Sequence, residues 1–268
     1  LPGETMFGHG FMTNHGGKGA NQAVAAARLG GDTAFIGKVG DDQFGNSTID
    51  MLRGEGIDVS ALKVTAEAPS GVAIITTIDS GENNIVLDSG ANACLTAADV
   101  REAEALFADA SIVLMQLETP VEALVEAAAL GKKAGAYVVL NPAPAPKKPL
   151  PEALLKNVDL LIPNETEASY IAGIEVKGED DIPAAMDEIQ KLGVKDVIIT
   201  VCSKDVCARL DGELIRVPAF KVKAVDTTAA GDTFCGALCV ALSQGKSLPD
   251  AILFGNKAAS ISVTRRGA

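Results

Sequence analysis

The sequence has no tryptophan, only two histidines and two tyrosines, and too few basic residues to balance its acidic ones. Lys and Arg number 23 against 35 Asp and Glu, which gives a net charge of −12. Such acidity argues against nucleic acid or an anionic membrane as a partner. An anionic substrate would therefore need backbone amides, individual lysines or a metal ion to bind it.

Long apolar runs and paired cysteines are missing as well. We see no stretch of about 18 apolar residues and no charged-then-apolar leader, so we expect no membrane span, no signal peptide and a cytoplasmic protein. The five cysteines lack C-x-x-C spacing, which fits neither a disulfide framework nor a zinc ribbon. Hydrophobic residues nevertheless make up 47% of the 268 residues, enough for a sizeable core, and we expect one domain over residues 1–268.

Helical and strand patterns alternate along most of the chain. Apolar strands separated by helices indicate a mostly parallel sheet covered on both faces, that is, a three-layer α/β/α fold. The expected strands are 33–39, 112–116, 137–140, 160–163 and 196–201, and the expected helices are 23–30, 45–55, 97–107, 120–134, 165–172, 182–192 and one that begins near Gly231.

One region breaks this alternation. Two β-rich runs, 72–78 and 84–87, flank the turn Asp-Ser-Gly-Glu-Asn at 79–83, which predicts a hairpin. A hairpin inserted into an alternating chain is typical of a lid. We expect lid segments at about 6–14 and 71–89 and a small β-sheet as the lid.

The stretch from Ala224 to Phe234 is the strongest candidate for chemistry. A helix that begins near Gly231 would point free amides and the positive end of its dipole at an anion. Asp232 stands at that start, where a carboxylate can act as general base for a hydroxyl that attacks a phosphate. This combination suggests phosphoryl transfer to an alcohol. The alternative is that Asp226 and Asp232 only cap and charge a core helix.

A second glycine-rich stretch, His15 to Gln22, runs directly into the predicted helix at 23–30. Its glycines permit close backbone approach to a ligand, and Lys18 and Asn21 add hydrogen-bond donors. It is not a Walker A loop, because no Ser or Thr follows its Gly-Lys pair, and it does not complete a dinucleotide fingerprint.

Polar side chains also follow the expected ends of several strands. Ligands of parallel sheets bind outside the carboxyl ends of the strands, so these residues should converge there. Each residue taken singly also fits a solvated loop or a helix cap. The set is Glu118, Asn141, Asn164 with Glu167, Thr200 with Ser203, and Asp226 with Asp232.

Two segments carry a resemblance to a known family: residues 16–23, Gly-Gly-Lys-Gly-Ala-Asn-Gln-Ala, and residues 226–234, Asp-Thr-Thr-Ala-Ala-Gly-Asp-Thr-Phe. With them, the whole chain resembles the ribokinase-like (PfkB) carbohydrate kinases. Residues 141–145 and 163–168 are closer to the ribose-specific members than to the fructose, adenosine or ketodeoxygluconate kinases. The resemblance implies ATP-dependent phosphorylation of the 5-hydroxyl of D-ribose, with Mg²⁺ and an activating K⁺, in a homodimer paired through its lid.

The same resemblance assigns roles to individual residues. Asp232 would be the base, and the amides of Ala229, Ala230, Gly231 and Asp232 would form the anion hole for the transferring phosphate. Gly17, Lys18, Gly19, Asn21 and Glu118 would hold the sugar. Asn164, Glu167, Thr200, Ser203, Gly231 and Asn256 would lie at the nucleotide, with Glu167 also associated with magnesium and phosphate. Potassium would be bound by Asp226 and Thr228 with backbone oxygens around Ser262, Arg265 and Gly267.

The chain departs from the family in three places. Family members begin with a strand that carries Gly-Ser-x-Asn-x-Asp, and they end with a further helix, so we expect a sequence trimmed at both termini. The nucleotide loop, usually Thr-x-Gly-x-x-Gly, has Cys202 and Asp205 at the glycine positions, which predicts weakened ATP affinity. Two alternatives stay open: a non-catalytic sugar- or nucleotide-binding relative, and a kinase of another small sugar or nucleoside such as deoxyribose.

Overall fold

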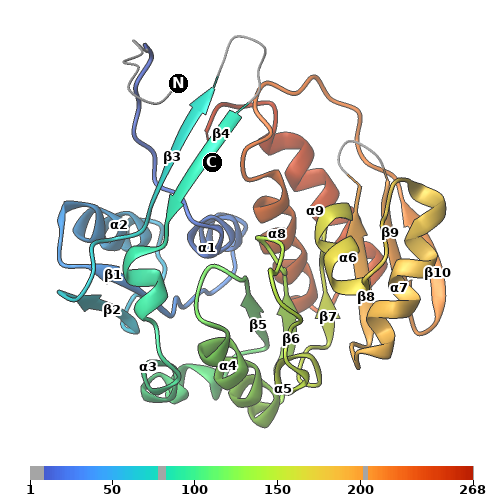
Figure 1. The fold of residues 1–268 in the computed structure, drawn as a ribbon, viewed down its shortest axis with the longest axis horizontal. Helices are drawn as coiled ribbons and strands as arrows, with labels where there is room; N and C mark the ends of the chain where they lie inside the picture. Colours follow the sequence, from blue (N-terminus) through green and yellow to red (C-terminus); the bar gives the residue numbers. More distant parts are fainter. Residues whose placement is uncertain (1–8, 78–82, 202–204, 268) are drawn as a thin grey trace.

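The structure is a computed structural model that describes residues 9–77, 83–201 and 205–267 (Figure 1). Its helices are α1 (Lys18–Arg28), α2 (Gln43–Gly54), α3 (Ala97–Glu102), α4 (Val121–Ala134), α5 (Glu152–Leu155), α6 (Glu165–Ala172), α7 (Ile182–Lys191), α8 (Ala230–Ser243) and α9 (Leu248–Ser262), with 3-10 turns η1 (Gly90–Cys94), η2 (Glu104–Phe107) and η3 (Glu179–Asp181). Its strands are β1 (Gly37–Gly40), β2 (Leu62–Thr65), β3 (Val72–Thr77), β4 (Asn83–Asp88), β5 (Ile112–Met115), β6 (Tyr137–Leu140), β7 (Leu160–Leu161), β8 (Asp196–Thr200), β9 (Val206–Leu210) and β10 (Glu213–Val217).

The central sheet has the order β10-β9-β8-β7-β6-β5, in which β5 to β8 are parallel and the β9–β10 hairpin is antiparallel. Successive strand residues face opposite layers, as the pleat requires. Val138 and Leu140 of β6 join the core that includes α4 and α7, while Val139 joins the core beneath α8 and α9. Figure 1 shows α4, α6 and α7 on one face and α8 and α9 on the other. The expected three-layer α/β/α fold is confirmed.

The elements predicted in the alternating part agree with the structure to within a few residues, with errors at their ends, but several other elements were missed. The strand expected at 33–39 is only an isolated bridge at Ala34 followed by β1, and β1 pairs with β2, a strand that the sequence analysis did not predict. The helix expected at 97–107 stops at Glu102 and continues as the 3-10 turn η2. The β9–β10 hairpin and α9 were also not predicted.

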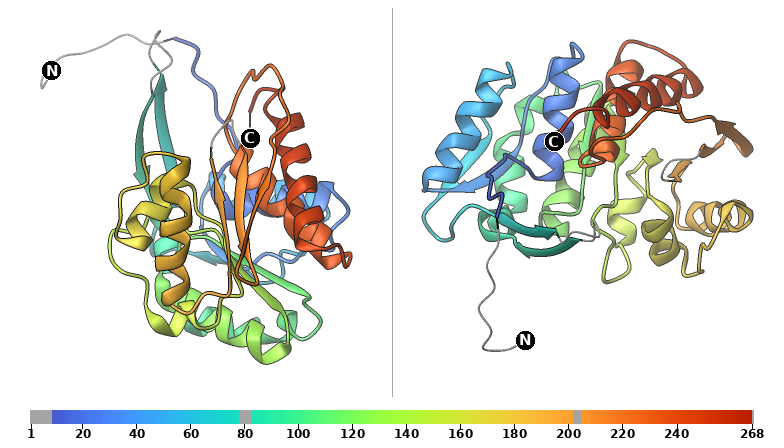
Figure 2. Two further views of the ribbon diagram at one scale, coloured as in Figure 1. Left: turned by 90° about the vertical axis from the view of Figure 1, so that its right-hand side faces the viewer. Right: turned by 90° about the horizontal axis from the view of Figure 1, so that it is seen from above.

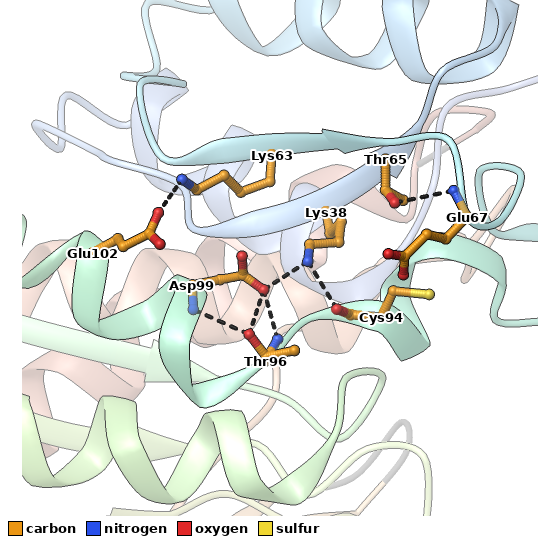
Figure 3. Close-up of polar contacts among 8 residues, drawn as sticks. All are labelled: Lys38, Lys63, Thr65, Glu67, Cys94, Thr96, Asp99 and Glu102. Carbon is orange, nitrogen blue, oxygen red and sulfur yellow. Dashed lines mark hydrogen bonds and ion pairs between the residues drawn. The ribbon is translucent and has the colours of Figure 1, made fainter.

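The two-stranded sheet of β1 and β2 is fastened to α3 by a cluster of polar contacts (Figure 3). Lys38 of β1 donates to Oδ2 of Asp99 at 2.6 Å and to the carbonyl of Cys94 at 2.9 Å. Asp99 also completes a capping box with Thr96 at the start of α3. Burial raises the pKa of Asp99, but the hydrogen bonds from Lys38 and Thr96 outweigh it and hold the pKa at about 2.

The β3–β4 ribbon projects from one end of the body (Figures 1 and 2). The two strands pair antiparallel and form a sheet of their own. This confirms the small β-sheet expected from the hairpin pattern at 72–87, although residues 78–82 at its turn lie outside the described residues. In the other expected lid segment, residues 9–14 are exposed and form no strand, and residues 6–8 also lie outside the described residues.

The base of the ribbon is tightly held. Asp42 accepts hydrogen bonds from the amide and the hydroxyl of Ser70, both at 2.7 Å, and from the amide of Gly45. Gly90 has φ 46°, and a Cβ there would lie 2.3 Å from the carbonyl oxygen of Pro69, so only glycine fits. Both strands of the ribbon therefore leave the body at fixed points.

Among the described residues, no helix is both long enough and apolar enough to cross a membrane.

Candidate active site

Asp232 lies in the first turn of α8, where the sequence placed the candidate base. Asp232 is only 7% exposed, and both of its carboxylate oxygens accept hydrogen bonds from protein side chains. Asn21 donates to Oδ2 at 2.9 Å, and Gln22 donates to Oδ1 at 2.9 Å. Two charge-assisted hydrogen bonds offset the loss of water around a buried carboxylate. These bonds hold the carboxylate in a fixed orientation.

The backbone in front of Asp232 has the geometry of an anion site. Ala229 is in the left-handed region at φ 57°, which ends the preceding loop and starts α8 without a side-chain cap. Ala230 donates its amide to the carbonyl of Thr227. Within the described part of the chain, the amides of Ala229, Gly231 and Asp232 have no hydrogen-bond partner. Three of the four predicted amides are thus open to an anion, and Ala230 is not.

The glycine-rich stretch before α1 lies beside this site. Gly17 has φ 90°, and a Cβ there would point at Glu118, 3.8 Å from Oε2. The amide of Lys18 donates to Oε2 of Glu118 at 2.7 Å. At Gly19, a Cβ would lie 3.0 Å from Oε1 of Gln116, so the close approach of α1 to β5 already explains this glycine. The structure therefore joins Gly17, Lys18 and Glu118 and gives Gly19 a packing role.

Two further carboxylates face the same region. Burial raises the pKa of Glu118, partly opposed by the amide of Lys18, and the charge of Asp232 raises it further. Burial likewise raises the pKa of Glu167, which is opposed by the Asn164 amide and by Lys18, while Asp232 again adds to the rise. Each of these two carboxylates is therefore within electrostatic reach of both Lys18 and Asp232. Two residues that follow separate strands, Glu118 after β5 and Glu167 after β7, are thus grouped near Asp232.

Sequence comparison fits this arrangement, because the whole chain, residues 1–268, matches the pfkB family of carbohydrate kinases. The chain belongs to this family. It is 45% identical to the ribokinase of Haemophilus influenzae, over 100% of this chain and 87% of that protein, and 36% identical to the deoxyribokinase of Salmonella typhi, over 99% and 86%. The structure of Arabidopsis thaliana ribokinase complexed with ribose and ATP superposes with a TM-score of 0.91 at 34% identity, covering 99% of this chain and 86% of that one.

The nucleotide positions suggested by the family resemblance are only partly brought together. Asn164 caps α6 by accepting from the amide of Glu167 at 2.8 Å, and Glu167 accepts from the amide of Asn164 in return. Thr200, at the end of β8, forms an isolated parallel β-bridge with Asn164 through the backbone. Asn256 lies on α9, and its side-chain amide donates to two backbone carbonyls at the end of β10, those of Val217 and Pro218. Ser203 lies outside the described residues.

The residues that the resemblance assigned to potassium come together around one loop. Asp226 accepts from the amide of Thr228 at 2.9 Å and from that of Gly267 at 3.0 Å. The hydroxyl of Thr228 and these two amides lower the pKa of Asp226. Arg265 and Ser262 form the next turn, in which the Arg265 amide donates to the Ser262 carbonyl. All five predicted residues therefore lie at the junction of the α8 entry loop with the end of α9.

Sequence reasoning missed the side chains that support the base. Asn141 was noted as a strand-end residue, but Gln22 and Gln116 were not considered as part of the site. Gln22 is 1% exposed and contacts Asp232, Asn141 and Gln116 through its amide group. The sequence offered only a weak signal. Gln22 is an amide residue between the glycine-rich stretch and the apolar part of α1, and its role became clear only from the fold.

Proposed function

We propose that this chain is an ATP-dependent kinase that phosphorylates D-ribose at the 5-hydroxyl. The observation that carries the proposal is the buried Asp232 carboxylate beside three open amides at the start of α8. The chain's membership of a carbohydrate kinase family gives this geometry its substrate class. The relative that is 45% identical is a ribokinase, which supports ribose as the sugar.

In this proposal the oxygen of the sugar hydroxyl attacks the γ-phosphorus of ATP, and Asp232 accepts the proton of that hydroxyl. The open amides of Ala229, Gly231 and Asp232 stabilise the charge on the transferring phosphoryl group. These amides are fixed by the backbone before substrate arrives, so they need little reorganisation during the reaction. The remaining non-catalytic alternative has less support, because the base, its donors and the open amides are all present together.

The sugar would lie between the start of α1 and Asp232. Lys18 supplies an ammonium group, Asn21 an amide and Glu118 a carboxylate, and the open backbone at Gly17 allows close approach. Charged and amide groups of this kind suit a polyhydroxylated ligand, because each hydroxyl can both donate and accept. Gly19, which lets α1 approach Gln116, is proposed as a further sugar-binding position.

ATP would lie on the side of Asn164 and Glu167. Thr200, Ser203 and Asn256 are proposed as further nucleotide contacts. Of these, Asn256 already donates its side-chain NH₂ hydrogens to backbone carbonyls, which leaves its side-chain oxygen free to accept from the adenine of ATP. Asp205, beside this loop, adds a negative charge that we expect to weaken ATP binding.

Mg²⁺ would arrive with the phosphates of ATP. The described residues contain no group of three or more His, Cys, Asp or Glu that could hold a metal ion by themselves, and Mg²⁺ commonly binds through one or two carboxylates plus substrate phosphates. Glu167 is the carboxylate that we propose for this contact. Potassium would use Asp226, Thr228 and backbone oxygens around Ser262, Arg265 and Gly267, because oxygen ligands suit a hard cation.

A homodimer through the β3–β4 ribbon completes the proposal. Ile74 pairs with Val86 on one face of the ribbon and Ala73 pairs with Leu87 on the other. Ile74 and Val86 are 61% and 60% exposed, and Leu87 is 54% exposed, so both faces are apolar and uncovered in the single chain. A sugar and the main body can cover only one face. The other face would pack against the ribbon of a second copy.

The proposal is tested by coupled ADP release with D-ribose, 2-deoxy-D-ribose, D-fructose and adenosine, with and without K⁺. We expect D-ribose to give the highest kcat/KM, with stimulation by K⁺. A preference for 2-deoxy-D-ribose would favour the deoxyribokinase alternative, which the 36% identical relative makes a specific rival. ATP consumption that no sugar stimulates would contradict the proposed function.

A further inference from the structure

A directional chain of amides runs behind Asp232. The backbone carbonyl of Ile162, after β7, accepts from Nδ2 of Asn141 at 2.8 Å. Oδ1 of Asn141 accepts from Nε2 of Gln22 at 3.0 Å. Nε2 of Gln22 also donates to Oδ1 of Asp232 at 2.9 Å, and Oε1 of Gln22 accepts from Gln116 at 2.6 Å. Both side-chain hydrogens of Gln22 and its oxygen are thus used.

The carbonyl of Ile162 sets the direction of donation along this series of hydrogen bonds. A backbone carbonyl can only accept a hydrogen bond, so the Asn141 side chain must turn its NH₂ group towards Ile162 and its oxygen towards Gln22. Gln22 must then present its own NH₂ group to Asn141, and its second hydrogen reaches Asp232. The sheet backbone therefore dictates that the carboxylate receives a donor at Oδ1.

The two oxygens of Asp232 differ in their surroundings. The bond from Gln22 to Oδ1 is buried, because Gln22 is only 1% exposed. The bond from Asn21 to Oδ2 is part-buried, at the first turn of α1 next to the glycine-rich stretch. Oδ2 is therefore the oxygen on the open side of the carboxylate, and Oδ1 faces the interior.

We propose that Gln22 is a positioning residue for phosphoryl transfer, which holds Oδ1 of Asp232 inward so that Oδ2 accepts the proton of the sugar hydroxyl. The inference rests on the proposed function. In the step, the hydroxyl O–H bond breaks and its proton moves to Oδ2. The hydroxyl oxygen bonds to the γ-phosphorus, and the bond from that phosphorus to the bridging oxygen breaks to release ADP. Gln22 contacts neither reacting oxygen nor phosphorus.

The charged and titratable groups around Asp232 come from four elements. Lys18 begins α1, Glu118 follows β5, Glu167 lies on α6, and Cys235 lies one turn further along α8. Burial raises the pKa of the Cys235 thiol well above its usual value, so this group stays neutral. Gln22 adds no charge to this set, which makes a charged replacement at this position informative.

The test compares Gln22→Met, Gln22→Glu and Gln116→Met, each checked by circular dichroism and thermal unfolding. Gln22→Met removes the donor at similar volume, and we expect kcat to fall about tenfold or more while KM for ribose changes less than about threefold. Gln22→Glu sets a second carboxylate against Asp232 and should move the acid limb of the kcat profile to higher pH by about one unit or more. Gln116→Met is the matched control, because it also removes one amide bond to Gln22 but does not touch Asp232.

Equal kcat values and pH profiles for Gln22→Met and Gln116→Met, when both are folded, would show that Gln22 is merely structural and would overturn the inference. An unmoved acid limb in folded Gln22→Glu would overturn it as well. If the wild-type chain prefers another sugar, the same comparison is made with that sugar. The role of Gln22 can then be tested even when ribose is not the substrate. Absence of phosphoryl transfer to any sugar would overturn both proposals.

Discussion

The start of α8 and the β3–β4 ribbon are built in opposite ways. Asp232 is buried, both of its oxygens are hydrogen-bonded, and its donors belong to α1, which packs directly against α8. In the part of the chain that the structure describes, the ribbon is exposed on both faces, and its base is held where Asp42 and Ser70 bond to each other. The difference is between reacting groups that the fold positions in advance and a ribbon whose apolar faces stay uncovered in the single chain.

The largest expected effect comes from removing the base. Asp232→Asn keeps the shape and a hydrogen-bonding side chain but cannot accept the proton, so we expect kcat to fall by about a hundredfold to ten-thousandfold. Ribose binding, measured by calorimetry, should change little, because Lys18 and Glu118 remain. Full turnover in this variant would show that another group takes the proton.

A smaller effect should follow from making the ribbon polar. Ile74→Ser with Val86→Ser replaces one exposed apolar pair, which should weaken the dimer and raise KM for ribose about tenfold, while kcat changes less. Ultracentrifugation and steady-state kinetics measure the two effects. A matched control is Ala73→Ser on the opposite face, where little apolar surface is lost. A dimer that resists the double substitution would place the subunit interface elsewhere.

The nucleotide side should respond more weakly again. Cys202→Gly with Asp205→Gly restores the glycines usual in the family and removes one negative charge. We expect KM for ATP to fall about threefold to tenfold, equivalent to about 1 kcal/mol. The single variant Asp205→Asn separates charge from bulk. An unchanged KM for ATP in the double variant would show that this loop tolerates its present residues.

The smallest effect on turnover is expected at the Lys38–Asp99 pair in Figure 3, which joins β1 to α3 and includes none of the residues proposed to bind ribose or ATP. Their side chains are only 13% and 16% exposed, so Asp99→Ala should lower the free energy of unfolding by about 2 kcal/mol and leave kcat unchanged. The nearby pair of Lys63 and Glu102 is 38% and 64% exposed, and Glu102→Ala should cost less than about 1 kcal/mol. Chemical denaturation measures both.

The same pair predicts a pH dependence. The pKa of Asp99 is held at about 2, below the usual 3.8, so its folded form favours the ionised carboxylate. The stabilisation is therefore fully present above about pH 4 and is lost as the pH falls from about 4 to 2. Wild-type and Asp99→Ala proteins should converge in stability over this range. A constant difference down to pH 2 would contradict the assigned ion pair.

The sequence alone was sufficient for the layers and for the position of the base. Apolar strands and helical periods are local signals, and Gly231 with Asp232 marked the start of α8 because a helix start has a local signature. The β1–β2 pair was missed because Leu62–Thr65 is short and pairs with a segment more than twenty residues away. Its partner β1 was placed too early for the same reason, since pairing and not composition defines where such a short strand begins.

The charged residues of the site could be predicted from the sequence, but the side chains that hold them in place could not. Lys18, Glu118 and Asp232 were identified by charge and by place in the chain, and the structure brings them to one edge of the sheet. Gln22 was overlooked because its contacts with Asn141 and Gln116 span 119 and 94 positions, respectively. Gly19 also packs against Gln116, and Asn256 also donates to backbone carbonyls, so each has a structural role beside its proposed ligand role. Such roles depend on tertiary contacts that no local pattern encodes.

The most direct measurement is the identity of the product. Wild-type protein is incubated with ATP, Mg²⁺, K⁺ and ribose carrying ¹³C at C5, and the product is followed by ³¹P and ¹³C nuclear magnetic resonance, with Asp232→Asn in parallel. The account predicts one phosphate ester that couples to the labelled C5 carbon, and almost none in the variant. A phosphate on another carbon, or equal product from the variant, would contradict it.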